Sequence, residues 1–251
     1  MSSPHKMETV PFQQVDFSTM LKKQFLYKVH AHYSMFSTMV ILQLIGVIFA
    51  FGGENYGTGT ENIMLNVKIS SGSIVIGFTL FWIFIMAILM TTKQNKSMMH
   101  TFITNKKLNH LSNILFLLLL SVIGGISSYL IGFFIKTITF LWYSTENIIV
   151  VEKITFVEVI LGIVVTTLYM FLLGAIGYFL GEIFALHRLF IIIIPVIFIG
   201  FLIIFHESAL GPMFDFFTQE SNFVIFTIKV FIVTSVLFLI ASQIDRYSEV
   251  S

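Results

Sequence analysis

The chain contains no cysteine and has little charge. Without cysteine, disulfide bonds, thiol nucleophiles and thiolate metal sites are all excluded. Charged residues make up only 11% of the 251 residues, whereas soluble domains carry about a quarter. Hydrophobic residues make up 57%, and phenylalanine alone occurs 29 times. This composition excludes a soluble globular domain and indicates an integral membrane protein.

Several catalytic and metal-binding motifs are also missing. There is no G-x-x-x-x-G-K-[ST] loop, so nucleotide hydrolysis would need a partner subunit. His206 and Glu207 begin an H-E-x-x-H zinc pattern, but Leu210 stands where the second histidine is required. There is no G-x-S-x-G motif, and no predicted span holds the paired carboxylates of an intramembrane hydrolase. We therefore expect no catalytic residue, no metal and no cofactor in this chain.

Runs of apolar residues predict six membrane-spanning helices, since about 20 such residues are needed to cross the hydrocarbon core. The predicted spans are 34–52, 73–92, 112–135, 156–181, 189–205 and 223–242. The predicted fold class is therefore all-α, a polytopic membrane protein. An even number of spans places both termini on the same side.

Lys and Arg are distributed unevenly between the two sides of this predicted topology. Ten of them lie on the side of the termini and three on the other side. Because positive charge is retained inside the cell, both termini are predicted to be cytoplasmic and the membrane to be the plasma membrane. The predicted organisation is a cytoplasmic arm over 1–33, a six-span domain over 34–242 and a cytoplasmic tail over 243–251.

The second half of the arm predicts an amphipathic helix. Phe17, Leu21, Phe25 and Val29 recur at helical spacing, with Lys22 and Lys28 between them. A basic amphipathic helix just before a span typically lies in the membrane interface with its apolar side in lipid. Such a helix can also contact a partner.

Three connections on the other side differ in composition. Residues 53–72 are rich in Gly, Asn and Thr, which predicts a solvated loop. Residues 136–155 contain aromatic and β-branched residues and are expected to lie in the headgroup region. Residues 206–222 mix aromatics with acidic residues, and both a segment that re-enters the membrane and a plain loop are compatible with them.

Two charged residues, Glu158 and Lys229, fall inside predicted spans, where charge is costly. Both are expected near the outer face. One interpretation is that Lys229 extends its ammonium group to the headgroups and that Glu158 is interfacial. The other is an outer-leaflet ion pair between the fourth and sixth spans.

Small residues at four-residue spacing predict close helix packing. Gly124, Ser128 and Gly132 form one such ridge, and Gly177 and Gly181 belong to another. Packing within one bundle or between two protomers explains them best. A contact with ligand is the alternative.

The connection between the second and third spans, residues 93–113, carries four lysines and no acidic residue. Its sequence from Met98 to Leu115 is MMHTFITNKKLNHLSNIL, in which apolar residues stand among the lysines. This segment resembles the cytoplasmic loop between spans two and three of type-2 ABC exporter permeases. The six-span layout and the amphipathic helix before the first span are also similar to that family.

The resemblance implies that the chain pairs with a second permease protomer, identical or different, and with a separate ABC ATPase that binds ATP and Mg. It implies that the loop is a coupling helix docked on the ATPase, through Ser97, Met99, Phe102, Ile103, Thr104, Asn105 and Lys106. The expected substrates are amphipathic or hydrophobic molecules, above all peptides of the toxin or bacteriocin type. Membrane lipid is the other expected partner, and no nucleic acid is expected.

Two other functions are compatible with the same topology. An immunity or regulatory membrane protein would share the spans and lack the ATPase partner. A polytopic membrane enzyme would need clustered polar residues near one face of the bundle. Attraction of the lysines to anionic lipid is likewise an alternative to docking for the loop itself.

Overall fold

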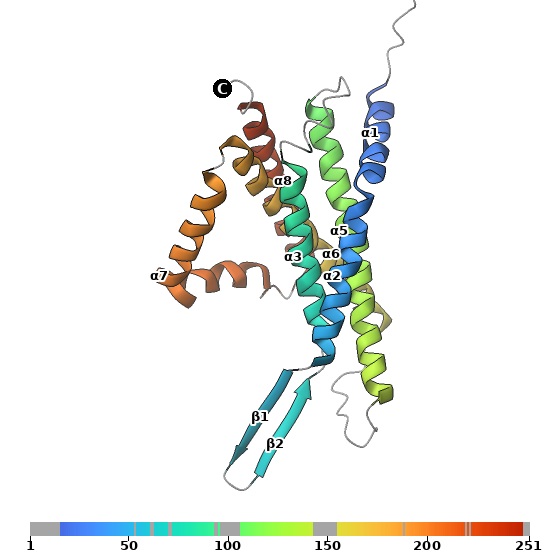
Figure 1. The fold of residues 1–251 in the computed structure, drawn as a ribbon, viewed down its shortest axis with the longest axis vertical. Coiled ribbons are helices and arrows are strands. Elements are labelled where there is room, and N and C mark those ends of the chain that lie inside the picture. The colour runs from blue at the N-terminus through green and yellow to red at the C-terminus, as the bar shows by residue number, and fades with distance from the viewer. Residues whose placement is uncertain are drawn as a thin grey trace, which may run out of the picture.

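The computed structural model describes residues 16–52, 54–60, 63–69, 72–92, 95, 106–142, 155–187, 189–218, 220 and 222–247. The described residues form seven helices and one pair of strands (Figure 1). The helices are α1 (Phe17–Ala31), α2 (Tyr33–Gly52), α3 (Ser73–Met90), α5 (Lys106–Trp142), α6 (Phe156–Leu186), α7 (Phe190–Thr218) and α8 (Phe223–Tyr247). The strands are β1 (Glu54–Thr60) and β2 (Ile63–Ile69).

Five of these helices, α2, α3, α5, α6 and α8, are long and apolar enough to cross a membrane. Helix α7 contains a shorter apolar segment, Phe190–Phe201. Large apolar side chains lie exposed on the outside of α2, such as Ile41, Leu44 and Ile48. The prediction of a helical membrane protein is confirmed at this level, since such surfaces are stable only against lipid or a partner.

Two of the predicted spans lie in helices that extend well beyond them. The span predicted at 112–135 lies in α5, which begins at Lys106 and ends at Trp142. Residues 136–142, expected in the headgroup region, are therefore the last two turns of this helix. With 37 residues, α5 is about 55 Å long, and about 30 Å suffices to cross the hydrocarbon core. The fifth predicted span, 189–205, lies in α7, which continues to Thr218.

The connection predicted as a solvated loop over 53–72 contains a β-hairpin instead. Strands β1 and β2 pair antiparallel, from Glu54 opposite Ile69 to Thr60 opposite Ile63. Two residues separate the strands in the sequence, which is the commonest length for a hairpin connection. The glycines and Asn55 of β1 concealed this strand, because glycine and asparagine are depleted in strands.

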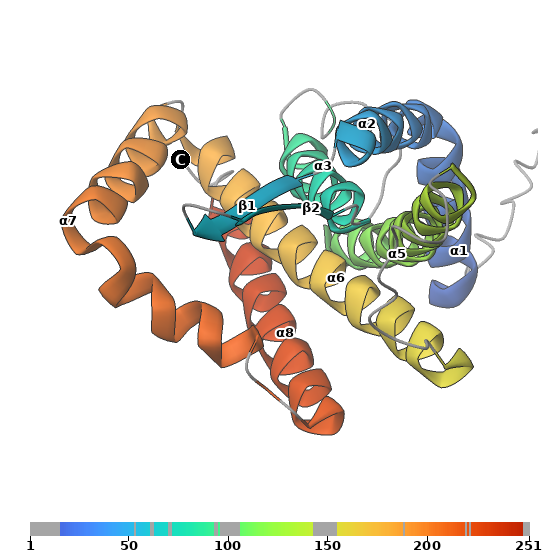
Figure 2. The same cartoon turned by 90° about the horizontal axis from the view of Figure 1, so that it is seen from below.

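Helix α6 is central to the bundle. It packs against α3 and α5 on one side and against α8 on the other (Figure 2). Helix α1 lies beside the first turns of α5, at the same end of the bundle as the last turns of α8 (Figure 1). We call this the α1 end, and the opposite end, from which β1 and β2 project, the hairpin end.

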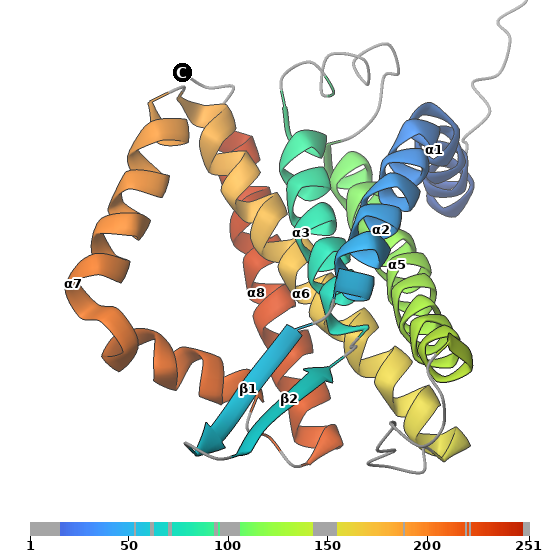
Figure 3. The ribbon, with the colours of Figure 1, turned by 60° about the horizontal axis from the view of Figure 1, so that its bottom comes forward.

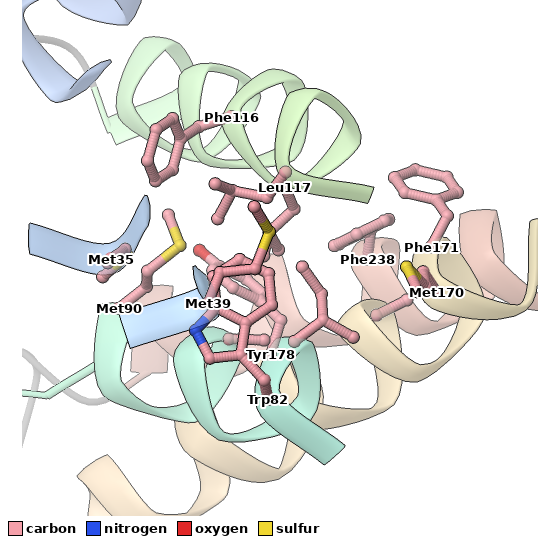
Figure 4. Packing of buried hydrophobic residues seen from close by; sticks show 14 of the residues in the cluster. Met35, Met39, Trp82, Met90, Phe116, Leu117, Met170, Phe171, Tyr178 and Phe238 are labelled. Carbon is pink, nitrogen blue, oxygen red and sulfur yellow. The ribbon is translucent and has the colours of Figure 1, made fainter. Parts of the chain in front are cut away.

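The main hydrophobic core joins α2, α3, α5, α6 and α8. Trp82 of α3, Phe116 of α5 and Met170 of α6 are fully buried in it (Figure 4). The indole Nε1 of Trp82 donates a hydrogen bond to Thr38 Oγ1 at 3.1 Å, so its polar atom is also paired. These contacts hold α6 between its neighbours.

The glycines of the two predicted ridges lie at contacts within the chain. Gly124 lies against Met170, Gly132 faces the backbone of Gly72, Gly177 faces the backbone of Phe84, and Gly181 faces that of Ile88. Ser128 is buried, and its hydroxyl donates to the carbonyl of Gly125. The small residues thus let α3, α5 and α6 approach one another closely.

Helix α7 is bent, and its two arms lead away from the end of α6 and back toward the start of α8 (Figure 3). The second arm is anchored, since the Tyr169 hydroxyl donates to the carbonyl of Phe217 at 2.7 Å. Phe217 also packs against a second cluster formed by Leu168, Phe226 and their neighbours. Residues 206–218, left open between a loop and a re-entrant segment, therefore continue α7 as helix.

Candidate functional site

Most of the predicted ATPase-contact segment falls outside the described residues. This holds for Ser97, Met99, Phe102, Ile103, Thr104 and Asn105. Lys106 is the first residue of α5. The described region that follows this segment in the sequence is the start of α5, and it carries a cluster of buried, hydrogen-bonded polar side chains.

Helix α1 docks on these first turns of α5 through a buried polar stripe. Its buried residues are Gln24 and Lys28, one turn apart, and only 1% of Lys28 is exposed. Phe25 and Val29 flank them and pack on the main core. Gln24 and Lys28 thus lie in the middle of the face of α1 that packs on the bundle, beside apolar residues of the same face.

The Lys28 ammonium group is held by oxygens of α5. Nζ donates to the Asn109 backbone carbonyl at 3.0 Å, to Asn109 Oδ1 at 2.7 Å and to Ser112 Oγ at 2.5 Å. It also donates to Asn113 Oδ1. An ammonium group has three donors, and these oxygens use all of them. Burial lowers the pKa of Lys28 from 10.5 to about 7, because charge is disfavoured away from water.

Gln24 completes the contact between α1 and α5. Its Nε2 donates to Asn109 Oδ1 at 3.2 Å. Its Oε1 is buried and has no hydrogen-bond partner among the described residues. An unpaired buried oxygen is costly, so the docked position of α1 depends on the contacts of Lys28.

This docking differs from the predicted orientation of the amphipathic helix. Lys22 and Lys28 were both expected on the solvated side, but Lys22 is exposed and Lys28 is buried. Phe17 and Met20 are exposed, which is compatible with an apolar side that lies in lipid. The amphipathic pattern of α1 predicts that its lysines face water. Burial of Lys28 is possible because oxygens of α5, about 80 residues away in the sequence, accept hydrogen bonds from it.

The same cluster continues from α5 to α6 and α8. Asn113 Nδ2 donates to the Tyr178 hydroxyl at 3.1 Å, and His110 Nδ1 lies 3.1 Å from the same hydroxyl. His110 Nε2 lies 3.0 Å from the backbone carbonyl of Phe238 on α8. One turn after Tyr178, Glu182 of the same helix is also buried, with 2% of the residue exposed.

We call these eight residues the polar joint: Gln24, Lys28, Asn109, His110, Ser112, Asn113, Tyr178 and Glu182. They come from α1, α5 and α6, and through the Phe238 carbonyl the joint reaches α8. In the described part of the chain no group of three or more His, Cys, Asp or Glu side chains could hold a metal ion. The hydrogen bonds of the polar joint connect α1, α5, α6 and α8 at the α1 end of the bundle.

The predicted pair between Glu158 and Lys229 is wrong, because each side chain has a nearer partner. Glu158 Oε2 accepts from the backbone N–H of Thr155 at 2.7 Å, in a capping box at the start of α6. Lys229 Nζ lies 2.8 Å from Glu220 Oε1 and 4.1 Å from the centre of the Phe216 ring. The structure therefore uses Lys229 to fasten the end of α7 to α8.

A double-mutant cycle on Lys229→Met and Glu220→Gln should show a coupling free energy of about 0.5–1 kcal/mol, as for partly exposed ion pairs. The cycle of Lys229→Met with Glu158→Gln should be additive. Thermal unfolding of the full chain in lipid nanodiscs measures both cycles. Coupling to Glu158 and additivity with Glu220 would show the reverse pairing.

No protein family model, curated protein or solved structure matches this chain. The interpretation of the polar joint therefore depends on its own geometry.

Proposed function

We propose that this chain is the membrane permease subunit of an ATP-driven ABC exporter. It pairs with a second permease protomer and with a separate ATPase that binds ATP and Mg, and it exports amphipathic or hydrophobic substrates, most naturally peptides. The chain itself hydrolyses no nucleotide, because it has no phosphate-binding loop. The family resemblance of the 93–113 connection and the apolar helices support this proposal.

The observation that supports the proposed permease function most strongly is the position of the polar joint along the chain. The expected ATPase-contact residues end at Lys106, and Asn109, Ser112 and Asn113 follow within two helical turns. Lys28 ties these turns to α1, while His110 and Asn113 tie them to α6 and α8. A displacement of the 97–106 segment by the ATPase would thus reach four helices at once, as a coupling element requires.

The proposed topology has six spans, with α7 supplying the fifth, and both termini in the cytoplasm. The excess of Lys and Arg on the α1 end supports this orientation. Alternation between inward and outward states is then a population shift, driven by the higher affinity of one ATPase state for one permease state. Substrates that are themselves apolar would enter from the inner leaflet.

Affinity purification of the full chain from its native membranes tests this function. We expect an ATPase with a phosphate-binding loop to be retained by the wild type. Phe102→Ala and Ile103→Asp should reduce the retained ATPase at least severalfold, because both remove apolar contacts from the docking segment.

Phe134→Ala is the matched control, since Phe134 lies in α5 far from the α1 end and is 62% exposed. It should retain the ATPase as the wild type does. Purification of the chain without any such ATPase would contradict the proposal and favour an immunity or regulatory protein. Equal retention by all variants would rule out docking through the 97–106 segment.

A further inference from the structure

Lys28 is buried at the contact between α1 and α5 without an opposite charge beside it. Only 1% of the residue is exposed, so its amine is shielded from water. The oxygens around Nζ belong to Asn109, Ser112 and Asn113, and all of them are uncharged. In the part of the chain that the structure describes, no carboxylate forms an ion pair with Lys28. An ammonium group at this position is therefore a buried charge without a counter-charge.

A buried charge without a partner is unstable relative to the neutral form of the same group. Lysine becomes neutral by releasing one proton, whereas arginine keeps its charge in proteins. Burial has this effect on Lys28, since it lowers the pKa of the amine from 10.5 to about 7. The neutral form is stable here only if the surrounding groups can also hydrogen-bond it.

The groups around Lys28 do suit a neutral amine, which donates two hydrogen bonds and accepts one. It can donate to the Asn109 carbonyl and to Asn113 Oδ1. It can accept from the Ser112 hydroxyl, which lies 2.5 Å from Nζ. The fourth oxygen, Asn109 Oδ1, already accepts from Gln24 Nε2 at 3.2 Å. Loss of the proton therefore removes a buried charge and leaves each of these groups with a hydrogen-bond partner.

The amine has a different proton affinity when α1 is away from α5, because water then surrounds it. Lysine in water keeps its proton up to about pH 10.4. The released helix thus binds one proton more than the docked helix. Gln24 also favours release, because its buried Oε1 has no hydrogen-bond partner among the described residues and gains water when α1 leaves.

We propose that α1 is a proton-controlled arm, which docks on α5 when Lys28 is a neutral amine and leaves α5 when this amine takes up a proton. The proton passes from water to Nζ as α1 leaves and returns to water as α1 docks. No other covalent bond forms or breaks. Acidification at the α1 end thus favours the released helix. This inference does not depend on the proposed function and holds for a protein with no ATPase partner.

The direction of the effect follows from the number of bound protons. Between about pH 7 and about pH 10.4 the released helix holds the additional proton, so docking becomes stronger as pH rises. The docking constant should increase by up to about tenfold per pH unit in this range. Below about pH 7 Lys28 is protonated in both positions, and the dependence on pH disappears.

Charged groups on the neighbouring helices change the proton affinity of Lys28. Positive charge opposes proton uptake, as for His32, because its charge and that of Lys28 disfavour each other. Carboxylates favour proton uptake. The titratable groups of the described helices at this end are Lys22, Lys23, His30 and His32 of α1, Lys107 and His110 of α5, Tyr178 and Glu182 of α6, and Asp245 of α8. All of them are retained when only Lys28 is changed.

The ionisation of Lys28 can be measured by NMR of the full chain in lipid nanodiscs, with lysine labelled with ¹³C. The signal that disappears in Lys28→Gln belongs to Lys28, and Lys28→Arg assigns it if Lys28→Gln does not fold. This signal should titrate roughly two pH units or more below those of the exposed Lys22 and Lys23. A Lys28 signal that titrates together with the exposed lysines overturns the proposal.

Docking is measured as the distance between spin labels on Thr19→Cys and Leu111→Cys, two exposed positions of α1 and α5. The distribution should be narrow at about pH 9.5 and broader at about pH 6.5. Lys28→Gln should give the same distribution at both pH values, because its uncharged amide has no proton to exchange.

Lys23→Gln is the matched control for Lys28→Gln, since it removes an exposed lysine of the same helix. Its distance distribution should respond to pH as that of the labelled chain with both lysines does. A labelled chain whose distribution changes with pH no more than that of Lys28→Gln contradicts control of docking by this amine.

Discussion

Gly177→Ala is expected to destabilise the protein by roughly 1–3 kcal/mol, the usual cost of forcing an extra carbon into a packed core. A Cβ on Gly177 would lie 2.5 Å from the Phe84 carbonyl oxygen and 3.1 Å from the Ala87 Cβ. The nearest atom belongs to the backbone of α3 and cannot turn away. Helices α3 and α6 must separate to accept the methyl group, and this separation disturbs the main core. The unfolding temperature in lipid nanodiscs measures the loss.

Gly77→Ala is the matched control for Gly177→Ala. A Cβ on Gly77 of α3 would meet nothing within 4 Å. Alanine also favours helix over glycine by about 1 kcal/mol, so Gly77→Ala should leave the unfolding temperature unchanged or raise it. Equal losses for the two variants would show that α3 and α6 are not in close contact at Gly177.

The second large effect is expected for Lys28→Met, which should detach α1 from α5. The substitution removes a donor from the oxygens of Asn109, Ser112 and Asn113, although Asn109 Oδ1 keeps the Gln24 amide and the Asn109 carbonyl keeps the Ser112 hydroxyl. Each buried oxygen left without a donor costs roughly 1–3 kcal/mol, partly offset because methionine has no charge to desolvate. The contacts of α1 that remain include the Gln24 amide and the partly buried Phe25 and Val29.

Spin labels at Lys22 and Lys107, both exposed, can measure the detachment because the chain has no competing cysteine. The distance distribution between α1 and α5 should broaden in Lys28→Met. In Lys23→Met, which changes an exposed lysine of the same helix, it should stay narrow. An unchanged distribution in Lys28→Met would show that the lysine does not hold α1.

The pH dependence gives a second measure of Lys28. Burial lowers the pKa of this amine in the native chain from 10.5 to about 7. Between these values the unfolded chain binds the extra proton, so this group makes the native state more stable as pH rises from about 7 toward 10.5. Lys28→Met should lose this increase.

The sequence predicted the spanning helices well because their signal is local. An apolar run of about 20 residues leaves a helix as the only stable choice in lipid. Helix ends were less predictable, and α5 shows the reason. Its first six residues, 106–111, were predicted as part of the connection, but the contacts of Asn109 with α1 and of His110 with α6 lie in helix.

The polar joint could not be predicted from residue patterns alone. Gln24 and Lys28 stand four residues apart, as do Asn109 and Asn113, so each pair shares one helix face. That spacing was the available signal, but nothing local indicates that the two faces meet. Glu158 is the opposite case, because its partner is local. The Thr155-x-x-Glu158 pattern predicts a capping box, whereas the expected depth of Glu158 in the membrane suggested a partner on another helix.

The most direct test of the proposed function is the rate of ATP hydrolysis by the partner ATPase, measured with and without this chain in lipid nanodiscs. The proposed coupling predicts that assembly with the wild type changes the rate severalfold. Ile103→Asp should abolish the change, and Phe134→Ala should preserve it. An ATPase that hydrolyses ATP at the same rate with and without the chain would contradict an ATP-driven permease.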